Sequence, residues 1–285
     1  MKKHRILYNP LSNGADLENA KTVESKFSEG DEFIYDDVTK ISDYNEYFSA
    51  LGEDEDAVLL GGDGTLNHAA NIFAGLEIKT DLYYIPMGTG NDFFTDVAKE
   101  GEEMVKLNRY FENLPTVTVN GKTSKFVNGV GFGIDGYCCE EGDKQRENGV
   151  EKINYASIAI KGLLFHFKKR NAKINVDGKE YEFKNIWLAP TMIGRYYGGG
   201  MKVAPDQDRL NENKELTLIL LHTKTKLSGL IVFPGLFSGK HVENKKATTV
   251  FTGKKITVTF DRPTPLQIDG ETVPNVISYT ANAAE

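Results

Sequence analysis

The run Ala57-Val58-Leu59-Leu60-Gly61-Gly62-Asp63-Gly64-Thr65 decides the fold of the first part of the chain. Four consecutive apolar residues are typical of a strand that is buried on both faces, as in a parallel sheet. The glycines end this strand, and a helical segment at 66–74 follows. Segment 82–85 repeats the design and ends in Pro86-Met87-Gly88-Thr89-Gly90-Asn91-Asp92. Two successive units of strand, glycine loop and helix predict a parallel sheet in an α/β layer.

The chain changes character on either side of these two units. Before them, strands are expected at 4–8 and 32–35 with a helix at 16–27 between them, which extends the α/β pattern. After about residue 114, short β-like runs dominate, and several alternate apolar with polar residues. These runs are 116–119, 172–176, 181–183, 186–189, 216–221 and 256–260. Tight-turn dipeptides stand at Asn120-Gly121, Asp177-Gly178 and Asp269-Gly270.

We therefore predict two domains. The first, 1–115, is an α/β domain with a parallel sheet, and the segment 274–285 could pair back onto it. The second, 116–273, is a mostly antiparallel β-sandwich.

Composition excludes several classes of protein. The formal net charge of -7 over 285 residues argues against a nucleic-acid binder, which normally presents a strongly basic face. No stretch approaches the roughly 20 apolar residues that a membrane-spanning helix needs, and no secretory signal is evident at the start. The two cysteines, Cys138 and Cys139, are adjacent and match no disulfide or metal spacing. We expect a cytoplasmic protein.

Both glycine loops carry a carboxylate, and this is informative about chemistry. Ligands of open α/β sheets bind beyond the carboxyl ends of the strands, where glycines and helix N-termini can approach phosphate closely. Asp63 and Asp92 would repel phosphate there unless a divalent cation bridges them, or unless one accepts a proton from a hydroxyl nucleophile. The two loops together predict a site for nucleotide phosphate and Mg²⁺. For either loop alone, a plain tight turn is an equal alternative.

Two other phosphate-binding patterns do not account for the chain. The Walker string G-x-x-x-x-G-K-[ST] is absent from the chain. Gly131-Phe132-Gly133-Ile134-Asp135-Gly136 fits the G-x-G-x-x-G string of dinucleotide-binding proteins. That string should open a helix inside an early βαβ unit, whereas this one lies in the β-rich part. We interpret it as a glycine-rich strand or bend.

Six motifs in order resemble the diacylglycerol kinase catalytic family, which groups bacterial diacylglycerol kinases and related lipid kinases with sphingosine and ceramide kinases. The first three are Asn9-Pro10-Leu11-Ser12, Gly61-Gly62-Asp63-Gly64-Thr65-Leu66-Asn67 and Pro86-Met87-Gly88-Thr89-Gly90-Asn91-Asp92-Phe93. The others are Asn128-Gly129-Val130-Gly131-Phe132-Gly133-Ile134-Asp135, Gly198-Gly199-Gly200-Met201-Lys202-Val203-Ala204-Pro205 and Asp269-Gly270-Glu271. The resemblance thus covers essentially the whole chain.

The resemblance implies an ATP-dependent lipid kinase with diacylglycerol as the favoured acceptor. The nucleotide would lie between the two domains, and Asp63 and Asp92 would organise Mg²⁺. Glu271 would lie near the transferred phosphate. The residues that would line ATP are Asn9, Ser12, Gly61, Gly62, Gly64, Thr65, Gly88, Thr89 and Asn91. The protein would act at the membrane surface from the cytoplasm, and a homodimer is left open.

Three departures from the family pattern qualify this picture. Ser12-Asn13-Gly14 supplies no lysine where relatives commonly have one, and Lys21 or Lys202 could replace it. His68 stands where relatives often have glutamate. The segment after Pro205 lacks the Asp-Asp-Gly that holds a structural cation in some members, although Asp206, Asp208 and Glu212 could form a second cation site.

Two alternatives to a lipid kinase stay open. The Gly-Gly-Asp-Gly loop also occurs in NAD kinases, so the acceptor could be a soluble nucleotide. The missing lysine and His68 are also compatible with a nucleotide- or lipid-binding regulator that has lost catalysis.

Two apolar segments have basic ends. Segment 153–167 runs into Lys168-Lys169-Arg170, and segment 227–237 is followed by Lys240-His241. Such helices can lie on an anionic membrane or can cover the sandwich, with the basic residues complementing the helix dipole. We favour the covering role, and we expect Trp187 to lie in the core.

Overall fold

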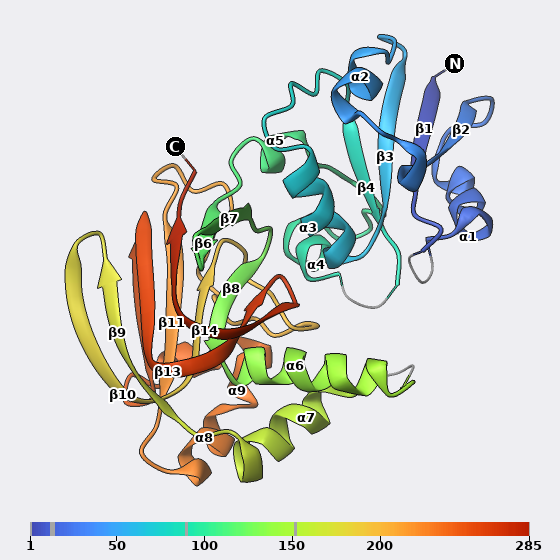
Figure 1. Cartoon of the computed structure of the whole chain (residues 1–285). Coiled ribbons are helices and arrows are strands. Elements are labelled where there is room, and N and C mark those ends of the chain that lie inside the picture. Colours follow the sequence, from blue (N-terminus) through green and yellow to red (C-terminus); the bar gives the residue numbers. More distant parts are fainter. Residues whose placement is uncertain (1, 12–14, 89–90, 151–152, 285) are drawn as a thin grey trace. The chain divides into compact units, whose positions relative to one another are not determined.

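The computed structural model describes residues 2–11, 15–88, 91–150 and 153–284, and the chain divides into two units. The first runs over Met1–Leu114 and the second over Pro115–Glu285. Figure 1 shows the elements of both units in chain colours.

The first unit is built on a five-stranded sheet, counted over its described residues, in the order β2-β1-β3-β4-β5. Its parallel strands are β1 (Lys3–Tyr8), β2 (Glu32–Asp37), β3 (Glu55–Gly61) and β4 (Leu82–Pro86). The short β5 (Val105–Lys106) is antiparallel to β4. The predicted parallel sheet is therefore confirmed. Its core contains Ile6, Val58, Leu60 and Ile85, which lie on the three central strands.

Short helices connect these strands. They are α1 (Leu17–Lys21), α2 (Tyr44–Ser49), α3 (Asp63–Ile72), α4 (Asp92–Val97) and α5 (Asn108–Phe111), with 3₁₀ turns at Thr22–Lys26 and Val38–Lys40. The helix expected at 16–27 ends early as an α-helix. At its end Thr22 donates its hydroxyl to the Asn19 carbonyl at 2.6 Å, and a 3₁₀ turn follows.

The second unit contains a nine-stranded antiparallel sheet, again counted over described residues. The order is β12-β11-β10-β8-β13-β14-β6-β7, and β9 pairs with both β10 and β13, so the sheet folds back on itself as a sandwich. The strands are β6 (Thr116–Val119), β7 (Lys122–Lys125), β8 (Gly129–Gly133), β9 (Arg170–Val176), β10 (Lys179–Met192), β11 (Leu216–His222), β12 (Thr248–Gly253), β13 (Lys255–Ile268) and β14 (Glu271–Asn282). The predicted antiparallel sandwich is confirmed.

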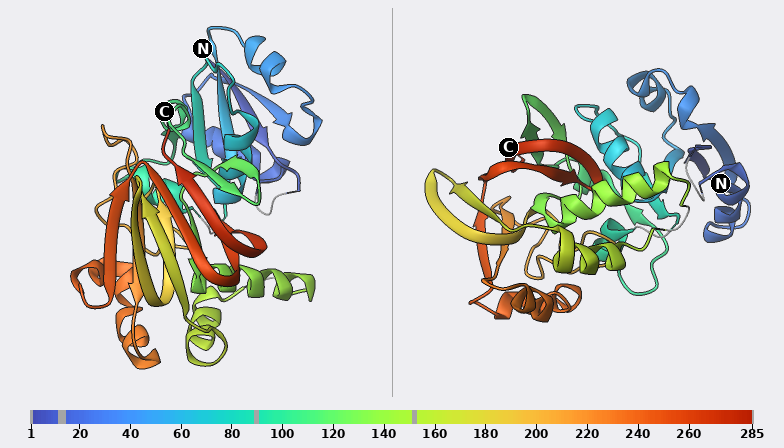
Figure 2. Two further views of the ribbon diagram at one scale, coloured as in Figure 1. Left: turned by 60° about the vertical axis from the view of Figure 1, so that its left-hand side comes forward. Right: turned by 60° about the horizontal axis from the view of Figure 1, so that its bottom comes forward.

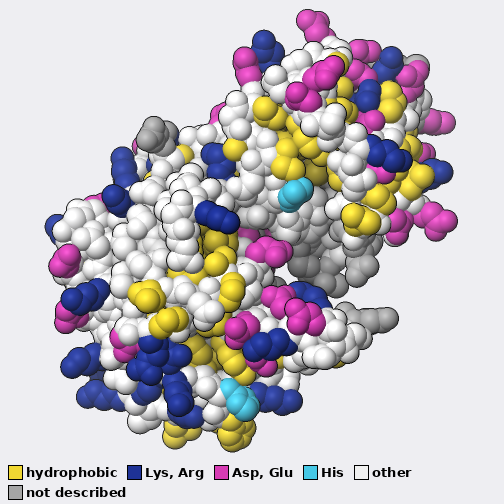
Figure 3. All heavy atoms as spheres, in the orientation of Figure 1, with side chains coloured by type: hydrophobic (Ala, Val, Ile, Leu, Met, Phe, Trp, Pro, Cys, Tyr) yellow, Lys and Arg dark blue, Asp and Glu magenta, His cyan; other side chains and the backbone are white. Residues whose placement is uncertain are grey.

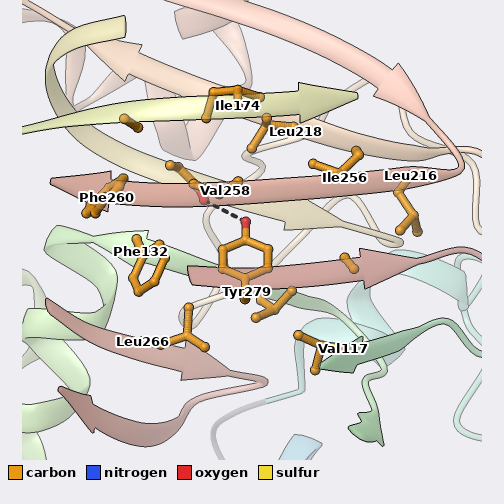
Figure 4. Packing of buried hydrophobic residues seen from close by; sticks show 14 of the residues in the cluster. Val117, Phe132, Ile174, Leu216, Leu218, Ile256, Val258, Phe260, Leu266 and Tyr279 are labelled. Atoms are coloured by element: carbon orange, nitrogen blue, oxygen red, sulfur yellow. Dashed lines mark hydrogen bonds between the residues drawn. The ribbon is translucent and has the colours of Figure 1, made fainter. Parts of the chain in front are cut away.

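Aliphatic and aromatic side chains pack together in the core of this sandwich, as Figure 4 shows. Phe132 of β8 stacks on Phe260 of β13 with ring centroids 4.6 Å apart, and Tyr279 of β14 packs beside them. The Tyr279 hydroxyl donates to the Ala189 carbonyl at 3.1 Å, so this buried phenol is satisfied.

Two details of the sandwich differ from expectation. The runs at 181–183 and 186–189 are one strand, β10, which is irregular between Phe183 and Ile186, where Asn185 has a φ of 60°. The chain end does not complete the first unit. Instead β14 pairs with β13 and β6 of the second unit, because its alternating apolar residues, such as Tyr279 and Ala281, face the sandwich core.

The glycine-rich string at 131–136 is a strand followed by a helix. The interpretation as a strand is confirmed by β8, but helix α6 (Ile134–Glu147), which the string opens, was missed. A Cβ at Gly131 would lie 2.5 Å from Pro190 Cα, and one at Gly136 would lie 2.1 Å from the Pro265 carbonyl oxygen. These glycines therefore admit neighbouring backbone.

Helices gather at one end of the second unit, as the views in Figures 1 and 2 agree. They are α6, α7 (Tyr155–Lys161), a π turn at Gly162–His166, α8 (Lys226–Val232), α9 (Gly235–Ser238) and a 3₁₀ turn at Lys240–Glu243. Their inner residues pack with Trp187 of β10 in a second apolar cluster, so the expected core role of Trp187 is confirmed. None of the helices in the described ranges is long and apolar enough to cross a membrane.

Candidate functional site

Three loops of the first unit meet at the carboxyl edge of its sheet. They follow β1, β3 and β4, which pair in parallel, so that Leu7 lies opposite Leu59 and Gly61 opposite Pro86. The chain leaves β1 towards β2 on one side and continues at β3 on the other. Open α/β sheets bind ligands beyond the carboxyl ends of the strands at such a reversal of strand order, which here falls between β1 and β3.

In the loop after β3, the backbone of Gly61 packs against the side chain of Thr65 in the following helix, α3. A Cβ at Gly61 would lie 2.3 Å from Thr65 Oγ1 and 2.5 Å from Thr65 Cβ, so only glycine leaves room for Thr65. Gly62 is the N-cap of α3 and provides no side-chain cap. The first amides of a helix are left without intrahelical partners, and together with the dipole they favour an anion.

Asp63 joins the two glycine loops. Its Oδ2 accepts the Asp92 N–H at 2.7 Å, and its Oδ1 accepts the Phe93 N–H at 3.0 Å. Both amides belong to the first turn of α4, so the carboxylate of one loop caps the helix that follows the other. Asp92 itself is buried at the start of α4.

Tyr84 is a contact of this site that sequence reasoning missed. It lies in β4 and is fully buried, and its hydroxyl donates to the Gly61 carbonyl at 2.8 Å. Burial, with a smaller contribution from the Asp63 charge, raises the pKa of Tyr84, so the phenol stays a protonated donor. The sequence feature that could have indicated this contact is a tyrosine within a continuous apolar strand, because a buried phenol needs a polar partner.

The remaining nucleotide-side residues lie in turns. Asn9 Oδ1 accepts the Leu11 N–H at 3.0 Å, which bends the chain directly after β1. Asn91 donates its side-chain amide to the Gly88 carbonyl at 3.0 Å. Ser12 and Thr89 lie outside the described residues. His68 is exposed on α3, and Lys21 is exposed at the end of α1.

Glu271 belongs to the second unit and begins β14. Its position is fixed by the preceding turn, because Asp269 accepts the N–H groups of Val127, Asn128 and Gly129 at 2.5, 2.7 and 2.9 Å. This clamp was also missed from the sequence, where Asp269-Gly270 indicated only a turn. The prediction that Glu271 lies near the transferred phosphate concerns both units and stays a prediction.

The described side chains offer few ligands for a metal ion. Across the described ranges, no three His, Cys, Asp or Glu residues gather in a way that could hold a metal ion. Asp206, Asp208 and Glu212 therefore form no such cluster. Arg209 beside them donates to the Asn128 side-chain oxygen at 2.6 Å and to the Val127 carbonyl. Asp63 still fits one Mg²⁺, because a carboxylate has about four acceptor positions and nucleotide oxygens can complete the shell.

Comparison with protein families agrees with this architecture. Residues 3–124 match the diacylglycerol kinase catalytic domain, and residues 128–281 match the YegS C-terminal NAD kinase beta sandwich-like domain. The fold and the two acidic glycine loops thus define the class of two-domain lipid kinases. The chain belongs to the diacylglycerol kinase catalytic family.

Individual relatives carry the same names. A diacylglycerol kinase of Bacillus subtilis (strain 168) is 27% identical over 285 residues, covering 95% of this chain and 90% of that protein. A diacylglycerol kinase of Mycobacterium tuberculosis (strain ATCC 25618 / H37Rv) is 27% identical over 216 residues, 70% of this chain and 66% of that protein. The crystal structure of a diacylglycerol kinase from Bacillus anthracis str. Sterne has a TM-score of 0.64 at 21% identity, covering 100% of this chain and 94% of that one. That likeness shows the fold.

Proposed function

We propose that this chain is an ATP-dependent kinase that transfers the γ-phosphoryl group to a lipid hydroxyl, with diacylglycerol as the acceptor. The observation that carries the proposal is the Asp63 carboxylate, which accepts the first two amides of α4. It holds two glycine loops together at the carboxyl edge of a parallel sheet, where this class of fold binds ligands. The names of the two curated relatives support the choice of acceptor.

The N-terminal turn of α3 would bind the phosphates of ATP. Glycines allow the backbone to come close, and the helix dipole favours the negative charge. The residues proposed to line the nucleotide are Asn9, Ser12, Gly61, Gly62, Gly64, Thr65, Gly88, Thr89 and Asn91.

Asp63 and Asp92 would hold Mg²⁺ jointly with phosphate oxygens. When bound, Mg²⁺ would neutralise charge on the transferred phosphoryl group. Asp63 has a second task that needs no metal, because its hydrogen bonds keep the loop after β4 next to the loop after β3.

Glu271 would act as the general base. The lipid hydroxyl oxygen forms a bond to the γ-phosphorus, the bond from that phosphorus to the β–γ bridging oxygen breaks, and ADP leaves. The hydroxyl proton passes to the Glu271 carboxylate. The clamp at Asp269 supports this role, since it fixes the turn from which Glu271 projects.

A kinase assay tests the proposal. Purified protein is incubated with labelled ATP, Mg²⁺ and mixed micelles that contain diacylglycerol, monoacylglycerol or a sphingoid base. We expect transfer to diacylglycerol, and a fall of at least about 100-fold in Asp63→Asn, because a charge that positions the transition state is lost. Asp54→Asn, at an exposed turn of the same unit, is the matched control and should keep wild-type activity. No transfer to any lipid, with Asp63→Asn equal to wild type, would contradict the proposal.

The NAD-kinase alternative is favoured by one observation, the NAD kinase beta sandwich-like character of residues 128–281. Competition between NAD and diacylglycerol in the same assay distinguishes the two acceptors. A regulator without catalysis would bind ATP in calorimetry and transfer phosphate to no lipid on the panel.

A lipid acceptor also leads to proposals for where the protein acts and how it assembles. A kinase that uses cytoplasmic ATP on a membrane lipid would work as a peripheral protein on the cytoplasmic surface. A homodimer remains a prediction, which analytical ultracentrifugation tests.

A further inference from the structure

The helices at the end of the second unit expose apolar side chains that the core does not use. Phe165 in the π turn is 72% exposed, and Leu227 and Ile231 of α8 are 67% and 70% exposed. Among the described large apolar residues, only Leu11 is more exposed than these three. Single exposed apolar residues are ordinary, but a group of them on neighbouring elements needs an explanation.

The inner faces of the same helices already account for covering the sandwich. Leu163 of the π turn and Val232 of α8 are buried in the cluster around Trp187. Gly229 of α8 lies so close to the Trp187 ring that a Cβ there would be 3.4 Å from Trp187 Cε2. The covering role predicted for these segments is therefore confirmed for one face of each helix and leaves the outer apolar face unexplained.

The three exposed side chains belong to one surface. Leu227 and Ile231 are four residues apart on α8, so they lie on the same side of that helix. Lys226 of α8 donates to the Leu164 carbonyl at 2.5 Å, which ties the start of α8 to the residue before Phe165. We call Phe165, Leu227 and Ile231 the apolar tip.

Basic residues surround the apolar tip, and acidic ones are missing from both segments. Residues 153–176 and 216–242 contain no Asp or Glu, although the whole chain has a formal net charge of -7. The exposed lysines here are Lys161, Lys168, Lys224, Lys226 and Lys240. Figure 3 shows Lys and Arg side chains gathered over this end of the second unit, with apolar side chains protruding at its lower edge.

We infer that the apolar tip and its lysines are a docking surface for an anionic lipid bilayer. A second copy of the chain would also cover the apolar tip. However, the matching face of that copy carries the same lysines, and residues 153–176 and 216–242 contain no acidic residue to pair with them. A bilayer offers what both features need, since Leu, Ile and Phe enter the acyl boundary while lysines remain among anionic headgroups. The inference deepens the proposed function, on which it rests for its purpose, because it names how the enzyme would reach an insoluble substrate.

Vesicle flotation without ATP tests the surface separately from the chemistry. The probes are vesicles of phosphatidylcholine alone and of phosphatidylcholine with phosphatidylglycerol. We expect binding to the anionic vesicles, a fall of at least about tenfold in the partition coefficient for Leu227→Ser with Ile231→Ser, and a similar fall for Lys168→Gln with Lys224→Gln. Only the lysine-dependent part should weaken with added salt.

Matched controls lie on other faces of the same unit. Ile277→Ser removes an exposed apolar side chain on β14, which is 48% exposed. Lys254→Gln removes a charge between β12 and β13. Both should bind as wild type does. Fluorescence of the buried Trp187 and the melting temperature check that each variant is folded.

Insertion depth is measured with a new tryptophan. Ile231→Trp should be quenched by brominated lipids in anionic vesicles, whereas Ile277→Trp should not, with Trp187 as the constant background. The inference is overturned if the wild type does not bind anionic vesicles, or if the tip variants bind as well as Ile277→Ser. It is equally overturned if ultracentrifugation finds that the tip mediates self-association that Leu227→Ser with Ile231→Ser abolishes.

Discussion

The glycine-rich strings at 61–65 and 131–136 have similar sequences, but their glycines have different structural roles. In the first unit, Gly61 leaves room for the side chain of Thr65 at the start of a helix. In the second, Gly133 leaves room for backbone, since a Cβ there would lie 2.3 Å from the Trp187 carbonyl oxygen. Each string also holds one aspartate. Both glycines end a strand that lies between two neighbours, so the difference comes from what packs against each glycine.

The two aspartates make the contrast sharper. Asp63 accepts two backbone amides, one at each oxygen. Asp135 is buried and accepts the Gly136 N–H at 2.9 Å with Oδ1, while its Oδ2 has no hydrogen-bond partner among the described residues. Burial raises the pKa of Asp135 to about 6. Burial thus favours the protonated form of Asp135, whereas both oxygens of Asp63 accept backbone amides.

Gly133→Ala should have the largest effect. A new Cβ would meet the backbone of Trp187 and Leu188, which cannot rotate away, and the φ of +128° is itself strained for alanine. Overpacking costs about 1–3 kcal/mol and the left-handed region about 1–2, so we expect a loss of about 4 kcal/mol in the free energy of unfolding. Urea denaturation measures it, with Gly121→Ala, which has φ +78° and open space, as the control for strain alone. Equal losses in both variants would contradict the steric explanation.

Asp135 should make stability depend on pH. Its pKa is near 6 when folded and 3.8 in the reference state, so between these values the folded protein holds a proton that the unfolded chain releases. The contribution of Asp135 is therefore complete below about pH 4 and is lost as pH rises to about 6, by roughly 2 to 3 kcal/mol. Asp135→Asn should remove this slope. Unfolding free energies at pH 4, 5, 6 and 7 test it, and an unchanged slope would show that water or another group already pairs with Oδ2.

Gly61→Ala should have the smallest effect of the three, and a second change should partly reverse it. The obstacle here is the Thr65 side chain, whose Oγ1, Cβ and Cγ2 would all lie within 2.7 Å of the new methyl group. We expect a loss of about 1–2 kcal/mol, and a favourable coupling when Thr65→Gly is added. A double-mutant cycle in urea measures this coupling. Strictly additive losses would mean that Gly61 is needed for its backbone conformation and not for Thr65.

The sequence predicted what depends on local pattern. Apolar runs and glycine loops predicted the parallel sheet, and alternating residues with tight turns predicted the sandwich. It could not predict contacts that close over long separations. The clamp of Asp269 on Val127 joins residues 142 positions apart, and nothing near either residue indicates the other. Helix α6 was missed for a related reason. Most of its residues are polar, and its glycines leave room for Pro265 and Tyr155, which come later in the chain.

The clamp also has a consequence for the order in which the chain can fold. The amides of residues 127–129 find their acceptor only when Asp269 is present, and β8 pairs with β13 near the end of the chain. Contacts of such separation are slow to form, and a domain cannot complete them before the ribosome has released the later strand. The first unit closes its sheet within its own 114 residues and has no such delay. A chain stalled before residue 255, where β13 begins, would therefore present a finished α/β sheet and an open edge at β8, which is where chaperones would be expected to bind.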